Sequence, residues 1–178
     1  MHVCCGPCST HAIEELSKEF DVTLFWSNSN IWPDEEYYKR ISAAKRIAVI
    51  YDLPIIEDFY DHILWRAAIR GLEKEPEGRK RCAKCFEYNL GKTAEYAAND
   101  GYEAFTTTLT ISPYKDSKLI FEIGERLGKK HGRKFLARDF KEDHGFDHSR
   151  KLSKEYDLYR QNYCGCEFSK RSMASPKE

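Results

Sequence analysis

The sequence predicts an α/β fold in which a parallel sheet is flanked by helices. Short apolar runs rich in β-branched and aromatic residues alternate along the chain with longer amphipathic segments, and the connections between them are short. This order favours parallel strands joined by helical crossovers. With 178 residues the chain is long enough for one domain with its own hydrophobic core.

The first strand is predicted to end at residues 1–3, which are apolar enough for a buried position. Residues 22–26 have the composition of a second buried strand, and residues 53–59 and 103–109 are weaker candidates. Between them, apolar residues at near-helical spacing indicate helices. These helices are predicted over residues 10–20, 34–51, 60–72, 85–99, 116–130 and 148–159.

We expect a single metal-binding domain over residues 1–170, followed by a flexible tail over residues 171–178. No internal repeat and no linker rich in Pro, Gly or Ser divides the chain. Hydrophobic residues make up 41% and charged residues 33%, which excludes a disordered or membrane-spanning chain. No secretory signal is recognisable at the start, so a reducing cytoplasm is the expected location.

The net charge is zero, because Lys plus Arg and Asp plus Glu both total 29. A protein that coats nucleic acid by bulk charge is therefore not expected. Two local basic stretches, residues 79–84 and 126–134, suit either a nucleic-acid patch or solvated helix ends.

The seven cysteines form three tight groups, and none lies outside a group. The groups are Cys4, Cys5 and Cys8; Cys82 and Cys85; and Cys164 and Cys166. In a reducing compartment such clusters are more often metal-binding or catalytic than structural disulfides. The first group follows the first strand and is predicted to form the loop into a helix capped by Ser9 or Thr10. A helix N-terminus there favours thiolates.

Spacing within the groups favours an iron–sulfur cluster over zinc. Cys82 and Cys85 have the two-residue spacer that lets both thiols reach one metal or cluster. Adjacent thiols need a tight turn, which Gly6 and Pro7 can supply, and a cluster can take them through different irons. A 4Fe–4S cluster is therefore predicted, held by Cys4, Cys5, Cys82 and Cys85.

Cys8, Cys164 and Cys166 are left over from this set of ligands. The one-residue spacer around Gly165 permits an easily reduced disulfide or two ligands to a second metal. A third interpretation is that these are simply buried thiols.

Several motifs together resemble the QueH family of epoxyqueuosine reductases, the cobalamin-independent enzymes of tRNA queuosine biosynthesis. The resemblance covers nearly the full length. It rests on HVCCGPCS at residues 2–9, NSNIWP at 28–33 followed by Glu36, Tyr37 and Arg40, RCAKC at 81–85, TTL at 107–109, SPYK at 112–115, and LYRQNYCGC at 158–166.

The resemblance implies a fold like the adenine-nucleotide alpha-hydrolase (HUP/PP-loop) group and reduction of epoxyqueuosine in tRNA to queuosine. It also implies a 4Fe–4S cluster on Cys4, Cys5, Cys82 and Cys85 with a second iron nearby. Cys164 and Cys166 would then be a redox-active or metal-facing pair. The chain departs from the family in a short first strand and in Ser29, where Pro is common.

Removing the epoxide oxygen requires two electrons, whereas a 4Fe–4S cluster normally passes one at a time. One hypothesis is a second iron, held by Cys8 with Cys164 or Cys166, that acts on the oxygen as a Lewis acid. The other is a cycle of Cys164 and Cys166 between dithiol and disulfide. The electron donor is not identified by the sequence. Candidates to ligate a metal or donate a proton are Asp139, His2 and Tyr114.

The substrate base lies in an anticodon loop and must be splayed out to reach a pocket. Trp32, Tyr37 and Tyr114 are candidates to stack on it. Other candidate substrate contacts are Asn28 and Asn30, together with Arg40, Lys115 and Arg160 for phosphates.

Two alternatives from other functional classes are a zinc-stabilised RNA-binding module without redox chemistry and a thiol–disulfide oxidoreductase without metal.

Overall fold

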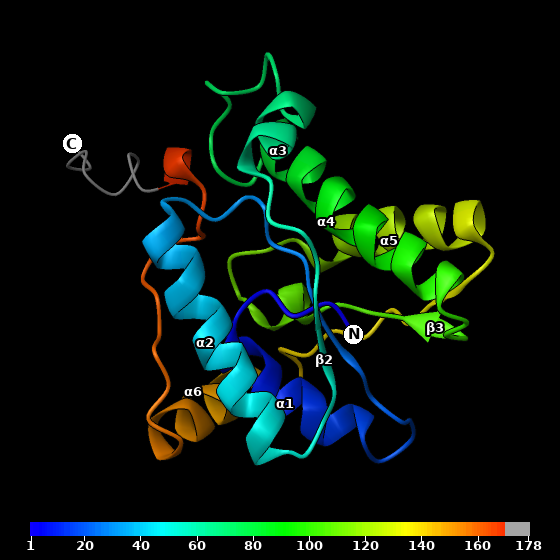
Figure 1. Ribbon diagram of the computed structural model, residues 1–178, viewed down its shortest axis with the longest axis vertical. Helices are drawn as coiled ribbons and strands as arrows, with labels where there is room; N and C mark the ends of the chain where they lie inside the picture. Colours follow the sequence, from blue (N-terminus) through cyan, green and yellow to red (C-terminus); the bar gives the residue numbers. More distant parts are fainter. Residues whose placement is uncertain (170–178) are drawn as a thin grey trace.

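The computed structural model describes residues 1–169, and these residues have an α/β architecture (Figure 1). The tail expected over residues 171–178 lies outside the described residues. The strands are β1 (Leu24–Trp26), β2 (Ile55–Glu57), β3 (Ala104–Phe105) and β4 (Lys134–Phe135). The helices are α1 (Gly6–Leu16), α2 (Asp34–Ile50), α3 (His62–Ala68), α4 (Lys80–Asn99), α5 (Ser117–His131) and α6 (Gly145–Glu155), with a short 3-10 helix η1 (Thr108–Ile111).

Two parallel strand pairs, β1 with β2 and β3 with β4, are joined by the start of the chain. His2 forms parallel bridges to Phe25 on one side and to Thr107 on the other. The Val3 amide donates to the Phe25 carbonyl at 2.9 Å, and the Thr108 amide donates to the His2 carbonyl at 3.0 Å. The side-by-side order is therefore β2, β1, residues 1–3, β3, β4, and the order reverses at residues 1–3. Ligands of open parallel sheets bind beyond the carboxyl ends of the strands at such a reversal.

The helices cover the strands from two sides, as Figure 1 shows for α1, α2 and α6 on one side and α4 and α5 on the other. One core cluster is built around Val3, Leu24 and Trp26 with the apolar faces of α1 and α2. A second cluster packs α4 and α5 on Phe105 and Phe135. All residues of β1 are buried, which is typical of a parallel strand with helices on both faces.

The expected parallel order of strands and helices is confirmed, but several boundaries differ from the prediction; α4, for example, begins at Lys80 rather than at Cys85 and so contains both Cys82 and Cys85. The first helix begins at Gly6 rather than near Thr10, because the Cys5 thiol caps it by accepting the Cys8 amide at 3.3 Å. Pro7 suits the first turn, where no backbone donor is needed. The segment expected as a strand over residues 103–109 is a two-residue strand followed by η1. No helix among residues 1–169 is long and apolar enough to cross a membrane.

Two helical glycines at the packing of α4 and α5 provide a matched test of the fold. A Cβ on Gly124 would lie 2.5 Å from the Phe135 ring, whereas one on Gly91 would meet only the Leu127 side chain at 3.9 Å. We expect Gly124→Ala to destabilise the protein by about 1–3 kcal/mol through overpacking. Gly91→Ala should be neutral or stabilise it by up to about 1 kcal/mol through helix propensity. Urea unfolding measures both; equal effects would contradict this packing.

Candidate metal centre

Three thiols gather at the point where the strand order reverses. The Sγ atoms of Cys4, Cys5 and Cys8 all lie within 4.8 Å of one another. Thr108 orients the first of them, because its hydroxyl accepts from the Cys4 amide at 3.0 Å and donates to the Cys4 thiol at 3.2 Å. The end of the first strand and the start of α1 thus present the three sulfurs together.

The three thiols differ in pKa and therefore in how readily they ionise. Burial opposes ionisation of Cys5, but hydrogen bonds from Cys4, Cys8 and Gln161 outweigh it and hold the pKa of Cys5 well below its usual range. The hydrogen bond to Cys5 raises the pKa of Cys4 to about 12, and hydrogen bonds to both neighbours raise the pKa of Cys8. The position of Cys5 at a helix N-terminus also favours a thiolate. Cys5 is therefore the thiolate around which the other two are arranged.

Cys82 and Cys85 lie one turn apart near the start of α4. The Cys82 thiol accepts the Gly78 amide at 3.1 Å, and the Cys85 thiol accepts the Trp65 indole N–H at 3.4 Å. Burial, followed by the charge of nearby Cys164 and Cys166, raises the pKa of Cys85 well above its usual range. Burial also raises the pKa of Cys82, and the same two cysteines contribute to the shift. The last two cysteines of the chain therefore face this helical pair.

The buried guanidinium of Arg40 holds the Cys164–Gly165–Cys166 turn in place. It donates to the Cys164 carbonyl at 2.9 Å and to the Tyr163 carbonyl at 3.2 Å. Its Nε pairs with Glu36 at 2.7 Å, and both side chains are almost fully excluded from solvent. Gly165 has a φ of 135°, and a Cβ there would lie 3.0 Å from Arg40. A glycine is needed both for this backbone conformation and for the close approach of the guanidinium.

Lys115 connects the thiol groups electrostatically. The charge of Cys164, followed by those of Cys4, Cys8 and Cys5, raises the pKa of Lys115 above its ordinary value and outweighs its partial desolvation. In return, Lys115 lowers the pKa of Cys164, although burial raises that pKa overall. The fold therefore brings cysteines of all three sequence groups into one region, where the charges of Lys115 and Arg40 both act on Cys164.

The predicted ligand and proton-donor residues lie in different environments. His2 is fully buried, and its ring bonds to Thr107 Oγ1 at 2.8 Å and to the Ser27 carbonyl at 3.2 Å. Burial lowers the pKa of His2 to about 4, so the ring is neutral and braces two strands. Asp139 pairs with Lys141 at 3.2 Å. Tyr114 is 89% exposed beside Lys115.

The predicted substrate contacts divide into buried and exposed residues. Asn28 donates to the Val3 carbonyl at 2.8 Å, and Asn30 accepts from Asn89 at 2.8 Å; both asparagines are buried. Arg40 is buried beneath the C-terminal cysteines, so it is not placed to meet a phosphate. Tyr37 is also buried and is not available for stacking. The exposed candidates are Trp32, Tyr114 and Arg160, whose guanidinium lies over the Phe146 ring.

Sequence reasoning did not identify the residues that orient the thiols. Thr108 and Glu36 belong to recognised motifs, but Thr108 acts on Cys4, 104 residues away, and Glu36 acts through Arg40, whose carbonyl partners lie 123 and 124 residues away. Trp65 lies in no such motif and offers no signal except its position in an amphipathic helix. These residues act on atoms that only the fold brings near them.

Comparison with known proteins places the chain in a family. The family described as epoxyqueuosine reductase QueH matches residues 1–172. The epoxyqueuosine reductase QueH of Streptococcus pyogenes serotype M1 is 40% identical over 175 residues, which cover 95% of this chain and 69% of that protein. The protein of the same name from Thermotoga maritima is 37% identical over 172 residues, covering 95% of this chain and 88% of the relative. The chain belongs to the QueH family.

As a member of the QueH family, the chain is an enzyme of the oxidoreductase class. A third relative, from Haemophilus influenzae, is 35% identical over 180 residues that span all of this chain and 74% of that protein. The resemblance seen in the cysteine motifs therefore extends over the whole length. A cysteine cluster at the carboxyl ends of the strands is compatible with a metal-dependent reductase.

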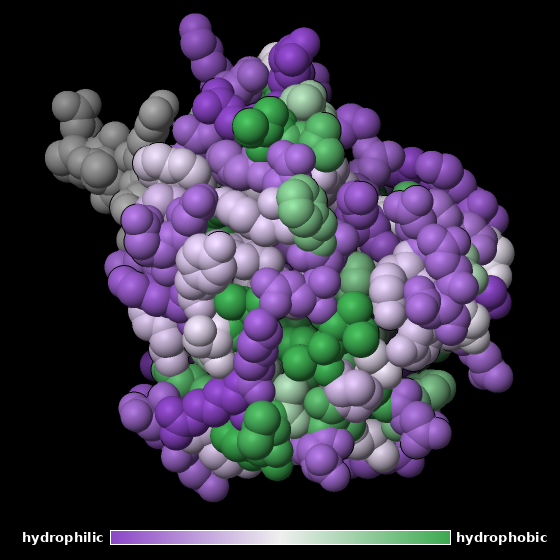
Figure 2. Space-filling model, viewed as in Figure 1, coloured by the Kyte–Doolittle hydropathy of each residue, from purple (hydrophilic) through white to green (hydrophobic). Residues whose placement is uncertain are grey.

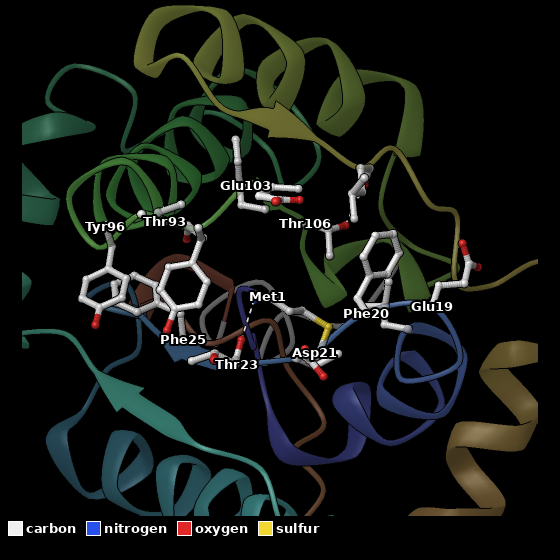
Figure 3. A pocket seen from close by; sticks show the side chains of 18 residues that line it. Met1, Glu19, Phe20, Asp21, Thr23, Phe25, Thr93, Tyr96, Glu103 and Thr106 are labelled. Atoms are coloured by element: carbon white, nitrogen blue, oxygen red, sulfur yellow. Dashed lines mark hydrogen bonds between the residues drawn. The ribbon is translucent and has the colours of Figure 1, made fainter.

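A large cavity lies at the opposite edge of the strands. It has a volume of about 530 Å³, and Figure 3 shows Met1, Thr23 and Glu103 among the side chains around it. Each of these three residues comes directly before a strand or bridge residue, at the starting ends of the strands, and the thiol centre lies beyond the other ends. Near the centre of the face in Figure 2, a hydrophobic region lies where Figure 1 places the N-terminus. The residues that line the cavity include no cysteine, so this cavity is separate from the thiol centre.

Replacement of Arg40 should disturb this QueH site through the C-terminal turn. Arg40→Lys keeps the positive charge beside Glu36 but loses the two guanidinium nitrogens that donate to backbone carbonyls of the C-terminal turn. We therefore expect a loss of roughly 1–3 kcal/mol in unfolding free energy. Arg46→Lys, at an exposed position of the same helix, should change it by less than about 0.5 kcal/mol. Urea unfolding compares them. Equal stability of both variants would contradict the assigned role of Arg40.

Proposed function

We propose that this enzyme reduces epoxyqueuosine to queuosine in tRNA with a 4Fe–4S cluster held by its own cysteines. The observation that carries the proposal is the convergence of three cysteine groups on one region at the carboxyl ends of the strands. Membership in the QueH family supports the substrate and the direction of the reaction. The strand order supports a fold of the HUP/PP-loop type, and residues 1–170 would form one metal-binding domain.

Cys4, Cys5, Cys82 and Cys85 are the proposed ligands of the cluster. Cys4, Cys82 and Cys85 are buried thiols with raised pKa values, which stay protonated unless a metal replaces the proton, whereas the lowered pKa of Cys5 already favours the thiolate that a soft metal binds. Backbone and indole N–H groups already point at Cys82 and Cys85, and such hydrogen bonds tune a cluster's potential. When bound, the cluster would supply electrons one at a time.

Cys8, Cys164 and Cys166 would complete the two-electron reaction. Reduction consumes two electrons and two protons, releases the epoxide oxygen as water and leaves a carbon–carbon double bond. If Cys164 and Cys166 supply them, two S–H groups become one disulfide, which balances the reaction. If Cys8 instead holds a second iron with one of them, that iron would offer a Lewis acid for the oxygen; the two electrons would then come one at a time through the cluster from an external one-electron donor, and the two protons from water. We favour the iron.

Lys115 would stabilise the anionic sulfurs and keep a proton at Nζ beside them. Its raised pKa results chiefly from the charge of Cys164, and it is the neighbour in sequence of the exposed Tyr114. The exposed side chains of Trp32 and Tyr114 remain available to stack on the splayed base. Arg160 is the remaining exposed cation proposed to meet the tRNA backbone.

The ligand assignment predicts different losses from two cysteine variants. After anaerobic reconstitution, Cys82→Ala should lose most of its iron and sulfide, because a three-thiolate site holds the cluster poorly. Cys8→Ala should keep both near wild-type amounts. Iron and acid-labile sulfide are measured per chain in each protein. Because Cys8 lies within 4.8 Å of Cys4 and Cys5, loss of the cluster from Cys8→Ala would show that Cys8 is a ligand instead.

The activity itself is tested with tRNA that carries epoxyqueuosine. Reduced, reconstituted enzyme should convert it to queuosine, as measured by nucleoside mass spectrometry after digestion. Cys164→Ala should reduce conversion at least about 100-fold while cluster content stays unchanged. A colourless protein that binds only zinc and converts nothing would support an RNA-binding module, and a metal-free protein that reduces disulfides would support a thiol oxidoreductase.

A further inference from the structure

A second group of ligating side chains lies away from the thiols, between α1 and α6. His11 and Glu14 are on α1, and His148 is on α6. One nitrogen or oxygen from each residue lies within 4.8 Å of the others. Figure 1 shows α6 alongside α1, and the buried Ser149 hydroxyl donates to the Pro7 carbonyl at 2.7 Å, so the two helices are in direct contact.

The packing of the two helices holds these side chains in position. Gly145, the first residue of α6, is buried against His11, and a Cβ there would lie 2.6 Å from the His11 ring. The His11 and His148 rings are 5.4 Å apart between centroids. Only a glycine lets α6 begin so close to the imidazole, and the next helical turn then brings His148 beside it.

Glu14 is oriented from outside the group. Its Oε1 accepts the Tyr51 hydroxyl at 2.9 Å, while its Oε2 lies 2.9 Å from Nε2 of His148. Metal-ligating carboxylates are commonly held by such an outer hydrogen bond, which fixes the direction of the remaining oxygen. The tyrosine thus leaves one carboxylate oxygen facing the histidines.

An ion pair accounts for only two of the three residues. It explains the contact between His148 and Glu14, but it does not include His11, whose ring nitrogen also lies within 4.8 Å of the ligating atoms of both. Two imidazoles and a carboxylate are the ligands that borderline divalent ions such as Zn²⁺ prefer, and three protein ligands leave a position for water. Soft cluster irons prefer the thiols instead.

We propose that His11, Glu14 and His148 bind a divalent transition-metal ion of the Zn²⁺ type, at a site separate from the cysteines. The ion would clamp α6 to α1, whose N-cap is Cys5 and whose first turn carries Cys8. The chain leaves α6 at Glu155 and returns to the thiol centre at Cys164. The metal site would therefore hold in place both the first cysteines and the segment that leads to Cys164, which the proposed function uses. Metal binding at this site does not depend on that function.

The test is a count of zinc ions on the iron-loaded enzyme. Wild type, His11→Gln and His148→Gln, each with equal iron and sulfide, are dialysed against buffered free Zn²⁺, and bound zinc is measured per chain. His131→Gln, which changes a histidine at the end of α5, is the matched control. Wild type and the control should bind one more zinc per chain than the two other variants.

Two further measurements keep the result decisive. Zinc should raise the melting temperature of wild type and the control but not of His148→Gln, whose exposed side chain can be replaced without loss of the fold. Tyr51→Phe should weaken zinc binding about 10- to 100-fold. Equal zinc content and equal melting shifts in all proteins would overturn the proposal and leave an ion pair alone. None of these readouts requires reductase activity, so failure of the reaction and failure of this site are distinguishable.

Discussion

The hydrogen bonds that hold residues 1–3 between β1 and the chain beyond β3 determine where the first cysteines lie. These residues make parallel bridges on both sides, through His2 to Phe25 and Thr107. Cys4 leaves the sheet where the strand order reverses, and Thr108 binds its thiol from the neighbouring strand end. Because α1 starts at once, Cys5 and Cys8 turn back toward Cys4 instead of diverging.

The C-terminal cysteines depend on a buried charge rather than on the sheet. Arg40 pairs with Glu36 inside the protein and uses its other two nitrogens for the carbonyls of Tyr163 and Cys164. Burying a guanidinium costs free energy unless its donors are satisfied, so the pair ties α2 firmly to a turn that belongs to no helix or strand. Gly165 supplies the backbone that this contact requires.

Most of the cysteine pKa values in the thiol centre are raised. Burial or neighbouring thiols raise the pKa values of Cys4, Cys8, Cys82, Cys85 and Cys164, whereas the pKa of Cys5 is lowered. A protein without metal would therefore hold mostly neutral sulfurs beside one thiolate and a charged Lys115. Deprotonation of so many thiols in one buried region becomes favourable when cations bind, which couples metal loading to proton release.

The sequence by itself determined the alternation of parallel strands and helices, the soft-ligand character of the site and the family to which the chain belongs. These follow from local periodicity and short spacings, such as Cys82 and Cys85 one helical turn apart. Only the tertiary structure decided that Arg40 and Tyr37 are buried, that His2 braces strands, and that His11 meets His148 across two helices. Each of these depends on contacts between residues far apart along the chain. A local sequence pattern does not show which distant residue will pack against a given side chain.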